Sequence, residues 1–219
     1  MTGKGGRNAA INAVGVTGLP CSGKSRAAER LAGLAGGEVI QADALGHAVL
    51  ERPEARELLR LRLGAGILAA DPAETRRRIA DRVFSDPAAL AWLESLVHPL
   101  VAAETAIRAA RLAGKRLAVI EAALLPVADM EHQCDRVILI EAEFPIRLDR
   151  AARRGWNRDE LERRDARLAP LFDPGRLAEI GGKLVCIRND KDDGRLGDEV
   201  AAVWEKWRQS HWPPERRLD

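Results

Sequence analysis

The chain has 219 residues, of which 46% are apolar, and this length and composition suit one folded domain with a sizeable core. Its 35 basic and 33 acidic side chains nearly cancel, which argues against a general nucleic-acid binder, because such proteins carry a basic stripe. No apolar run is long enough to cross a bilayer, and the basic segment Met1–Asn8 lacks the apolar stretch of a signal peptide, so we expect a loose N-terminal extension. The three cysteines are far apart, which predicts no disulfide framework and suits the reducing cytoplasm.

Five short apolar runs predict strands that are buried on both faces, because each run is continuously apolar rather than alternating. Helical patterns separate the runs, from Ser25–Ala35, which Gly36 and Gly37 close, to Asp198–Arg208 near the end. This alternation predicts a parallel sheet with helices on both faces. The predicted strands are Ala13–Thr17, Glu38–Gln41, Arg116–Glu121, Arg136–Glu141 and Lys183–Arg188.

Two longer segments interrupt the alternation. Residues 44–114 look mostly helical and exceed an ordinary crossover, and residues 144–176 are crowded with arginine. We interpret them as a helical insertion and a lid at the substrate face of a single domain, whose core comprises about 13–43, 115–143 and 177–208. The tail that begins at Trp212 is expected to be frayed or extended.

A phosphate-binding loop is predicted between the first strand and the first helix. Residues 18–25 match G-x-x-x-x-G-K-[ST], in the strand–loop–helix context that this pattern requires. In such a loop Gly18 and Gly23 allow unusual backbone conformations, and backbone N–H groups, with that of Ser22 among them, point at the phosphates. Lys24 would reach the β- and γ-phosphates, and the Ser25 hydroxyl would hold Mg²⁺. An ordinary glycine-containing turn is the alternative.

The middle of this loop is unusual in composition. Pro20 has no N–H group, so one phosphate contact is lost there. Cys21 lies near the positive end of a helix, which favours its thiolate, but we favour the alternative that it is a small residue that fits the loop.

An ordered set of motifs resembles the dephospho-CoA kinase family from about Val14 to Trp207. The loop alone is common to many kinases, whereas Asp43 together with His98-Pro99 is much more specific. The chain departs from the family pattern at Leu19, Cys21, Arg26, Gln41 and Ala123, and we interpret it as a divergent member. The similar segments are residues 14–25, Val39-Ile40-Gln41-Ala42-Asp43, Asp71 through Arg76 to Val83-Phe84, Leu93-Glu94 with His98-Pro99-Leu100, Ala123-Leu124-Leu125, the pair Arg150 and Arg154, and Arg188-Asn189-Asp190.

The resemblance implies a three-layer α/β P-loop kinase fold with a parallel five-stranded sheet, a helical acceptor-binding insertion and a lid. It implies ATP and Mg²⁺ as cofactors and phosphorylation of the ribose 3′-hydroxyl of dephospho-CoA as the reaction. No nucleic acid or membrane is expected as a partner, and a monomer is expected, with an oligomer left open. Two alternatives remain: another P-loop small-molecule or nucleotide kinase, and a non-catalytic nucleotide-binding relative.

Two carboxylates are candidates for the chemistry. Asp43 follows the second predicted strand at its carboxyl end, where ligands of open α/β sheets bind, and it can accept the proton of the acceptor hydroxyl. Its alternative role is the N-cap of a helix that begins near Ala44. Glu121 ends the third strand and can orient Mg²⁺ through water, or it is an ordinary strand-end carboxylate.

The remaining candidates are basic residues. Arg150 and Arg154 are four apart on a predicted helix, so they share one face and suit phosphate oxygens of ATP; a solvated basic face is the alternative. The resemblance places His98 and Arg76 in the acceptor site. The alternatives are that His98 is a packed structural residue and that Arg76 is a surface residue. The full assignment is Gly18, Cys21, Ser22, Gly23, Lys24, Ser25, Arg26 and Arg150 for nucleotide, Lys24, Asp43 and Arg154 for catalysis, Asp43, Arg76 and His98 for acceptor, and Ser25 and Glu121 for metal.

Overall fold

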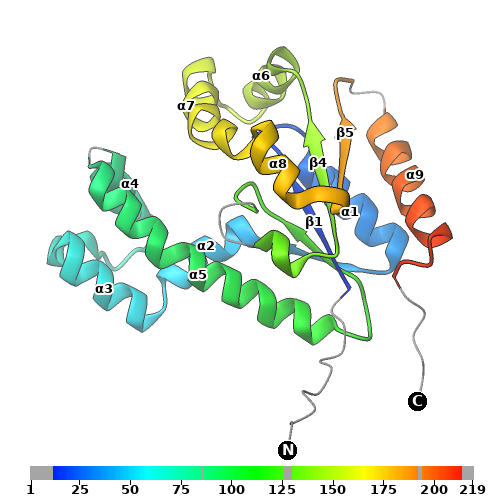
Figure 1. Cartoon of the computed structure of the whole chain (residues 1–219). Helices are drawn as coiled ribbons and strands as arrows, with labels where there is room; N and C mark the ends of the chain where they lie inside the picture. Colours follow the sequence, from blue (N-terminus) through cyan, green and yellow to red (C-terminus); the bar gives the residue numbers. More distant parts are fainter. Residues whose placement is uncertain (1–11, 85, 126–129, 192–193, 214–219) are drawn as a thin grey trace, which may run out of the picture. The chain divides into compact units, whose positions relative to one another are not determined.

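The computed structural model describes residues 12–84, 86–125, 130–191 and 194–213 (Figure 1). The chain divides into two compact units, one formed by residues 1–41 and 106–219 and the other by residues 42–105. The expected extension Met1–Asn8 lies outside the described residues. No described helix is both long enough and apolar enough to cross a membrane.

The first unit contains a five-stranded sheet in the order β2-β3-β1-β4-β5, and every pairing is parallel, as predicted. Two strands begin later than predicted. Residues 115 and 116 belong to the turn after a helix, where their N–H groups donate to the Leu112 carbonyl, and Lys183 lies in a short 3₁₀ turn. The strands are β1 (Ala13–Thr17), β2 (Glu38–Gln41), β3 (Ala118–Glu121), β4 (Arg136–Glu141) and β5 (Leu184–Arg188).

Helices α1 (Lys24–Ala35) and α9 (Arg195–Gln209) pack side by side over one face of this sheet (Figure 1). The core between them and the strands is made of aliphatic side chains such as Val16, Leu31 and Val200. Gly36 ends α1 in the left-handed region with φ 60, which confirms the predicted glycine cap.

Trp212 corrects the expectation of a frayed tail. Its side chain is 9% exposed, and its ring packs edge to face against Trp207 and Trp204 of α9. The Trp212 N–H also donates to the Trp207 carbonyl. Burial of an indole outweighs the entropy of ordering the short segment that carries it. Residues 214–219 lie outside the described residues.

The opposite face of the sheet is covered by the segment that follows β3. Leu125 and Met130 are fully buried there. A Cβ atom on Gly15 of β1 would come within 2.6 Å of the Leu125 side chain, so glycine lets this segment approach the strand closely. The described part of this segment contains the short 3₁₀ helix η2 (Met130–Gln133), which contacts β1.

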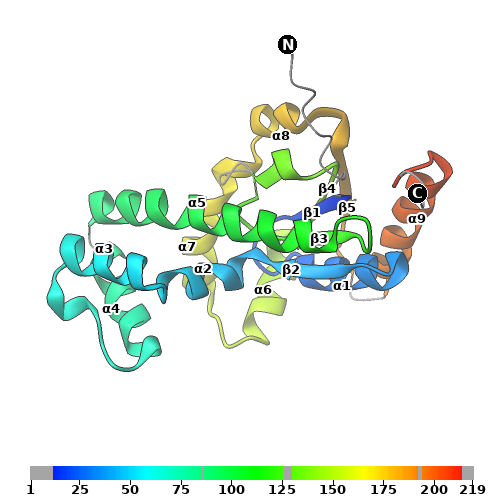
Figure 2. The same ribbon diagram turned by 90° about the horizontal axis from the view of Figure 1, so that it is seen from below.

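The second unit is helical and has its own core, which includes Leu59, Ile67 and Ile79. Figure 2 shows α2 lying along α5, where a Cβ atom on Gly46 would be 4.0 Å from the Val97 side chain. Its elements are α2 (Ala42–Leu50), α3 (Pro53–Leu63), η1 (Ala65–Ile67), α4 (Pro72–Phe84) and α5 (Pro87–Leu112), of which α5 runs on into the first unit.

Helix α5 passes through His98 and Pro99 without a break, although the residue before a proline disfavours the helical conformation. A proline inside a helix removes one backbone hydrogen bond and crowds the preceding turn. The 26-residue helix carries this defect because many helical residues flank Pro99 on each side.

The arginine-rich segment belongs to the first unit and folds as short helices. Helix α6 follows β4 directly, so the segment begins at the carboxyl edge of the sheet. The elements are α6 (Phe144–Ala152), α7 (Arg158–Leu168), η3 (Ala169–Phe172) and α8 (Pro174–Ile180). The predicted lid, residues 144–176, ends inside α8, so from here on the name lid refers to residues 144–180.

Candidate active site

The loop from Gly18 to Gly23 connects β1 to α1, and two of its positions accept only glycine. Gly18 has φ 144, and a Cβ atom there would lie 2.2 Å from the Ile140 carbonyl oxygen. Gly23 has φ 109, and its Cβ atom would lie 2.4 Å from the side-chain nitrogen of Asn189. The glycines of the motif thus allow both the turn and the close approach of β4 and of the segment after β5.

Cys21 adopts φ 61, which is uncommon for a residue other than glycine. Its side chain is 6% exposed and packs with Ala151 and Leu161 of the lid. This burial favours the interpretation of Cys21 as a small packing residue over that of an accessible thiolate.

Arg150 of the lid holds the loop from outside. Its guanidinium donates to the carbonyl oxygens of Cys21 at 3.5 Å, Ser22 at 3.3 Å and Asn189 at 2.9 Å. Asn189 adds a bond of 2.6 Å from its amide nitrogen to the Ser22 carbonyl. With these carbonyls bound on the outside, the loop is supported in one conformation.

Arg154 lies beyond the helix that carries Arg150, which corrects the prediction that the two share a helical face. Helix α6 ends at Ala152, and Gly155, with φ 77, turns the chain so that the Trp156 N–H donates to the Ala151 carbonyl. Arg154 is exposed in this turn. The four-residue spacing between Arg150 and Arg154 does not reveal that the helix ends before Arg154.

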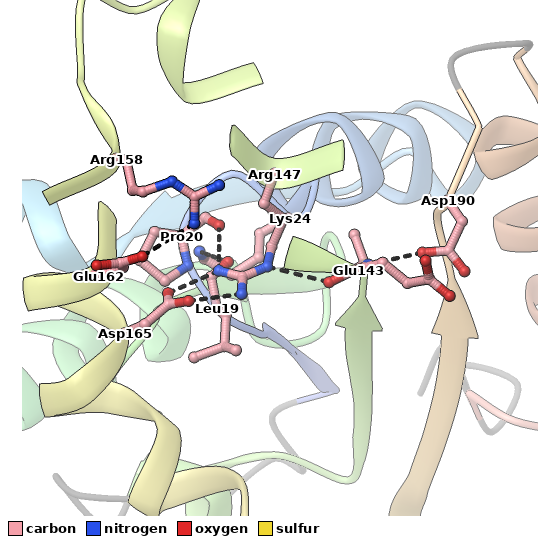
Figure 3. A network of polar contacts seen from close by, with 10 residues as sticks. Leu19, Pro20, Lys24, Glu143, Arg147, Arg158, Glu162, Asp165 and Asp190 are labelled. Carbon is pink, nitrogen blue, oxygen red and sulfur yellow. Dashed lines mark hydrogen bonds and ion pairs between the residues drawn. The ribbon is translucent and has the colours of Figure 1, made fainter. Parts of the chain in front are cut away.

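The side chains after the loop approach its opening and the end of β3. The Lys24 Nζ donates to the Leu19 carbonyl at 3.3 Å, so the ammonium group folds back over the loop (Figure 3). The Ser25 hydroxyl donates to Glu121 Oε1 at 2.6 Å. Arg26 is exposed on α1.

The Ser25–Glu121 pair has the chemistry of a Mg²⁺ site. Glu121 is only 8% exposed, and its carboxylate accepts the Ser25 hydroxyl at the carboxyl end of β3. A buried carboxylate favours a nearby cation. Hard oxygen ligands from one or two side chains, completed by water and phosphate, are the usual protein surroundings of Mg²⁺.

Two hydroxyl groups in this region are buried without a hydrogen-bond partner in the part of the chain that the structure describes. They belong to Thr17 at the end of β1 and to Ser22 in the loop. Buried polar groups are almost always satisfied, so unpartnered ones beside the loop suit a site that binds a polar ligand.

Asp43 lies in the first turn of α2, which begins at Ala42. This start corrects the alternative that Asp43 is the N-cap of a helix beginning near Ala44. Its side chain is exposed, and a carboxylate in the first turn is favoured by the helix dipole. Two residues earlier in the chain, Gln41 ends β2 opposite Glu121 of β3.

His98 and Arg76 both belong to the second unit. Arg76 Nη1 lies 3.6 Å from Glu51 Oε1, and His98 is half-buried on α5. Their assignment to the acceptor stays a prediction.

Arg147 and Asp165 are the residues of this region that the pattern analysis missed. Arg147 is buried and forms a two-bonded ion pair with Asp165 beside the loop (Figure 3). One signal existed: Arg147 shares the apolar face of α6 with Phe144, Leu148 and Ala151, at helical spacing. A charge on an apolar face indicates a buried partner.

The order of the parallel strands, the glycine geometry of the loop and the Ser25–Glu121 pair at its opening define a P-loop kinase. A family model described as dephospho-CoA kinase matches residues 12–178. The chain belongs to the dephospho-CoA kinase family.

Individual relatives agree with this assignment. The chain is 34% identical over 197 residues to a dephospho-CoA kinase of Thiobacillus denitrificans, covering 89% of this chain and 94% of the relative. It is 37% identical over 170 residues to one of Deinococcus radiodurans, covering 76% and 81%.

Solved structures share the fold. A Thermus thermophilus protein superposes with a TM-score of 0.69 at 28% identity, covering 89% of this chain and 97% of the other. A dephospho-CoA kinase from Campylobacter jejuni gives 0.63 at 22% identity, covering 91% and 98%, and at this identity it supports the fold alone.

Proposed function

We propose that this chain transfers the γ-phosphoryl group of ATP to the ribose 3′-hydroxyl of dephospho-CoA and releases CoA and ADP. The observation that carries the proposal is the contact of Ser25 with Glu121 at 2.6 Å, beside a loop whose two glycines have the required conformation. The choice of dephospho-CoA as the acceptor in this proposal rests on membership of the dephospho-CoA kinase family.

The loop and Lys24 bind the phosphates. Backbone N–H groups from Gly18 to Ser25 and the positive end of α1 attract the β- and γ-phosphates, and the Lys24 ammonium neutralises charge that develops during transfer. Phosphoryl transfer needs little covalent chemistry from the protein, so positioning and charge neutralisation carry the rate.

Ser25 and Glu121 would hold Mg²⁺. The ion, when bound, supplies neutralisation of the phosphate charge at the opening of the loop. The protein contributes two oxygen atoms from different elements, α1 and β3, that are already in contact.

Asp43 accepts the proton of the acceptor hydroxyl. Its support is its place two residues after β2, whose last residue pairs with Glu121 in the sheet. The exposed Arg154 reaches the transferred phosphoryl group from the lid, while Arg76 and His98 contact the acceptor from the helical insertion. These roles are proposals that rest on the family pattern.

An assay of ADP release with ATP, Mg²⁺ and dephospho-CoA tests the function. We expect turnover with dephospho-CoA and little with nucleoside monophosphates. Lys24→Ala should lower the rate at least ~100-fold, whereas the control Lys206→Ala, on the exposed side of α9, should not. ATP binding without ADP release would instead indicate a non-catalytic relative.

We also propose that the protein works as a monomer in the cytoplasm. Its three cysteines, Cys21, Cys134 and Cys186, are all unpaired, which suits a reducing compartment. Size-exclusion chromatography with light scattering measures the oligomeric state.

A further inference from the structure

Arg147 is a charged residue in an apolar position. It is 4% exposed on the face of α6 that also carries Leu148 and Ala151. A buried guanidinium keeps its charge, so it must find hydrogen-bond acceptors on every side.

Four acceptors surround this guanidinium, and all of its nitrogen atoms donate. Nη1 and Nη2 form two bonds of 2.6 Å to the carboxylate oxygens of Asp165 on α7. Nε donates to the Ala142 carbonyl at 3.1 Å, and Nη1 also donates to the Pro20 carbonyl at 3.3 Å (Figure 3). Arg147 therefore joins the end of β4, the lid helix α7 and the phosphate-binding loop.

The bond to Pro20 acts on the part of the loop that departs from the family pattern. The Pro20 carbonyl and the Cys21 N–H belong to one planar trans peptide, in which the two groups point in opposite directions. A donor that holds the carbonyl on the lid side therefore turns the Cys21 N–H away from the lid. Because Pro20 has no N–H of its own, the Cys21 N–H is the first donor available after Leu19.

Cys21 also needs support in this conformation. Its φ of 61 lies in a region that residues other than glycine seldom adopt. Such conformations persist where the surroundings hold the chain on both sides. Arg147 binds the carbonyl before Cys21, and Arg150 binds the carbonyl of Cys21 itself.

We infer that Arg147 and Asp165 form a positioning pair that orients the Pro20–Cys21 peptide for nucleotide phosphate and links lid helix α7 to the loop. A glycine would adopt this loop conformation without support, whereas here the side chains of the pair hold the loop in it. The inference rests on the proposed function only in that nucleotide binds at the loop.

The test uses a double substitution, because removing one partner alone leaves a buried charge without compensation and unfolds many proteins. In Arg147→Met with Asp165→Leu both charges disappear and the volume is roughly kept. Replacing a buried ion pair by apolar residues is often neutral or stabilising, which offsets the loss of the bonds to the Ala142 and Pro20 carbonyls, so we expect the variant to fold. The Pro20 carbonyl, however, loses its donor.

Affinity for MgATP is measured by calorimetry without acceptor, and KM values are then measured for both substrates. We expect the dissociation constant and KM for ATP to rise at least about 10-fold, as on loss of a hydrogen bond to a charged group. The KM for dephospho-CoA should stay within about twofold, because the change lies in nucleotide binding.

The matched control is Arg208→Met with Glu205→Leu, which removes an exposed ion pair on α9. It should leave both constants unchanged. A folded double variant with wild-type affinity for MgATP would overturn the inference. A lower kcat with an unchanged KM for ATP would also overturn it, because that result indicates only a smaller fraction of folded enzyme.

If the double variant does not fold, Arg147→Lys decides. Lysine keeps a charge opposite Asp165 but cannot reach all the acceptors with a single nitrogen. Weaker MgATP binding supports the inference, and unchanged binding overturns it. Failure of the wild-type protein to bind MgATP would instead contradict the nucleotide site itself, so the two failures are distinguishable.

Discussion

Ser25 and Glu121 touch through a hydrogen bond of 2.6 Å that joins the first turn of α1 to the last residue of β3. Strand β3 lies between β2 and β1, where Glu121 pairs with Gln41 on one side and Val16 on the other. The carboxylate thus occupies the edge of the sheet at which the phosphate loop begins. We expect the carboxylate to attract the metal that accompanies ATP, and this defines a prediction.

Glu121→Gln should change the response to Mg²⁺ more than the fold. The amide oxygen still accepts the Ser25 hydroxyl, but the charge that attracts the cation is gone. We expect a ~10-fold or larger fall in turnover and a higher Mg²⁺ concentration for half-maximal rate, as for loss of one group that neutralises charge. A magnesium titration of the rate measures both. Glu38→Gln, at the other end of the sheet, is the control, and equal responses of the two variants would remove Glu121 from the metal site.

Gly18→Ala tests the backbone geometry of the loop. The new Cβ would stand 2.2 Å from the Ile140 carbonyl oxygen at φ 144, so either β4 or the loop must move. We expect at least ~1 kcal/mol of destabilisation from backbone strain, together with loss of ATP binding. Thermal melting and calorimetry measure the two effects.

Gly33→Ala is the matched control for that substitution. Gly33 is exposed in α1, and a Cβ there has no neighbour within 4 Å. Alanine should raise stability by about 0.5–1 kcal/mol, because it favours the helix. A stable Gly18→Ala variant that binds ATP would show that the loop tolerates a side chain at this position.

Much of the fold followed from local patterns. Strands β1, β2 and β4 have the predicted limits. In β1 and β4 a continuous apolar run is buried in the sheet, as the pattern indicates, whereas both ends of the short edge strand β2 are exposed. Local preference misleads where other interactions decide the structure. Trp212 is ordered by the packing of its ring against Trp207 and Trp204, and α5 continues through Pro99 although proline disfavours a helix interior.

The site likewise contains residues that a local motif predicts and residues that only the folded structure brings together. The loop is a contiguous motif with conformational requirements at Gly18 and Gly23, so its pattern was sufficient. Arg147 and Asp165 lie 18 positions apart on two helices, and no period relates them. Arg154 illustrates the reverse error, since its spacing from Arg150 suggested a shared face that the early end of α6 removes.

The three cysteines should react with a thiol reagent at very different rates. Cys186 on β5 is exposed, whereas Cys21 and Cys134 are buried. Burial raises the pKa of the Cys134 thiol to about 12, and burial together with the nearby Glu141 carboxylate raises the pKa of Cys186. Since the thiolate is the reactive form, labelling of Cys186 should quicken as the pH rises toward and above the usual thiol pKa.

We therefore expect one fast thiol per native chain and three after denaturation. Mass spectrometry after a timed reaction identifies the labelled residue, and Cys186→Ser should leave no fast thiol. Labelling of Cys21 at the rate of Cys186 would contradict its packing against Ala151 and Leu161.

Asp43→Asn separates a catalytic from a structural role. Asparagine keeps the shape but cannot take a proton, so turnover should fall ~10²–10⁴-fold, the usual range for general acid–base help. Because Asp43 is exposed in the first turn of α2 and is not its N-cap, stability should fall by no more than ~1 kcal/mol through the helix dipole. The control is Asp198→Asn, which makes the same change in the first turn of α9. Turnover and melting temperature are measured on both variants. Full activity in Asp43→Asn would end its assignment as the base, and a collapsed melting temperature with low activity would make it a structural residue.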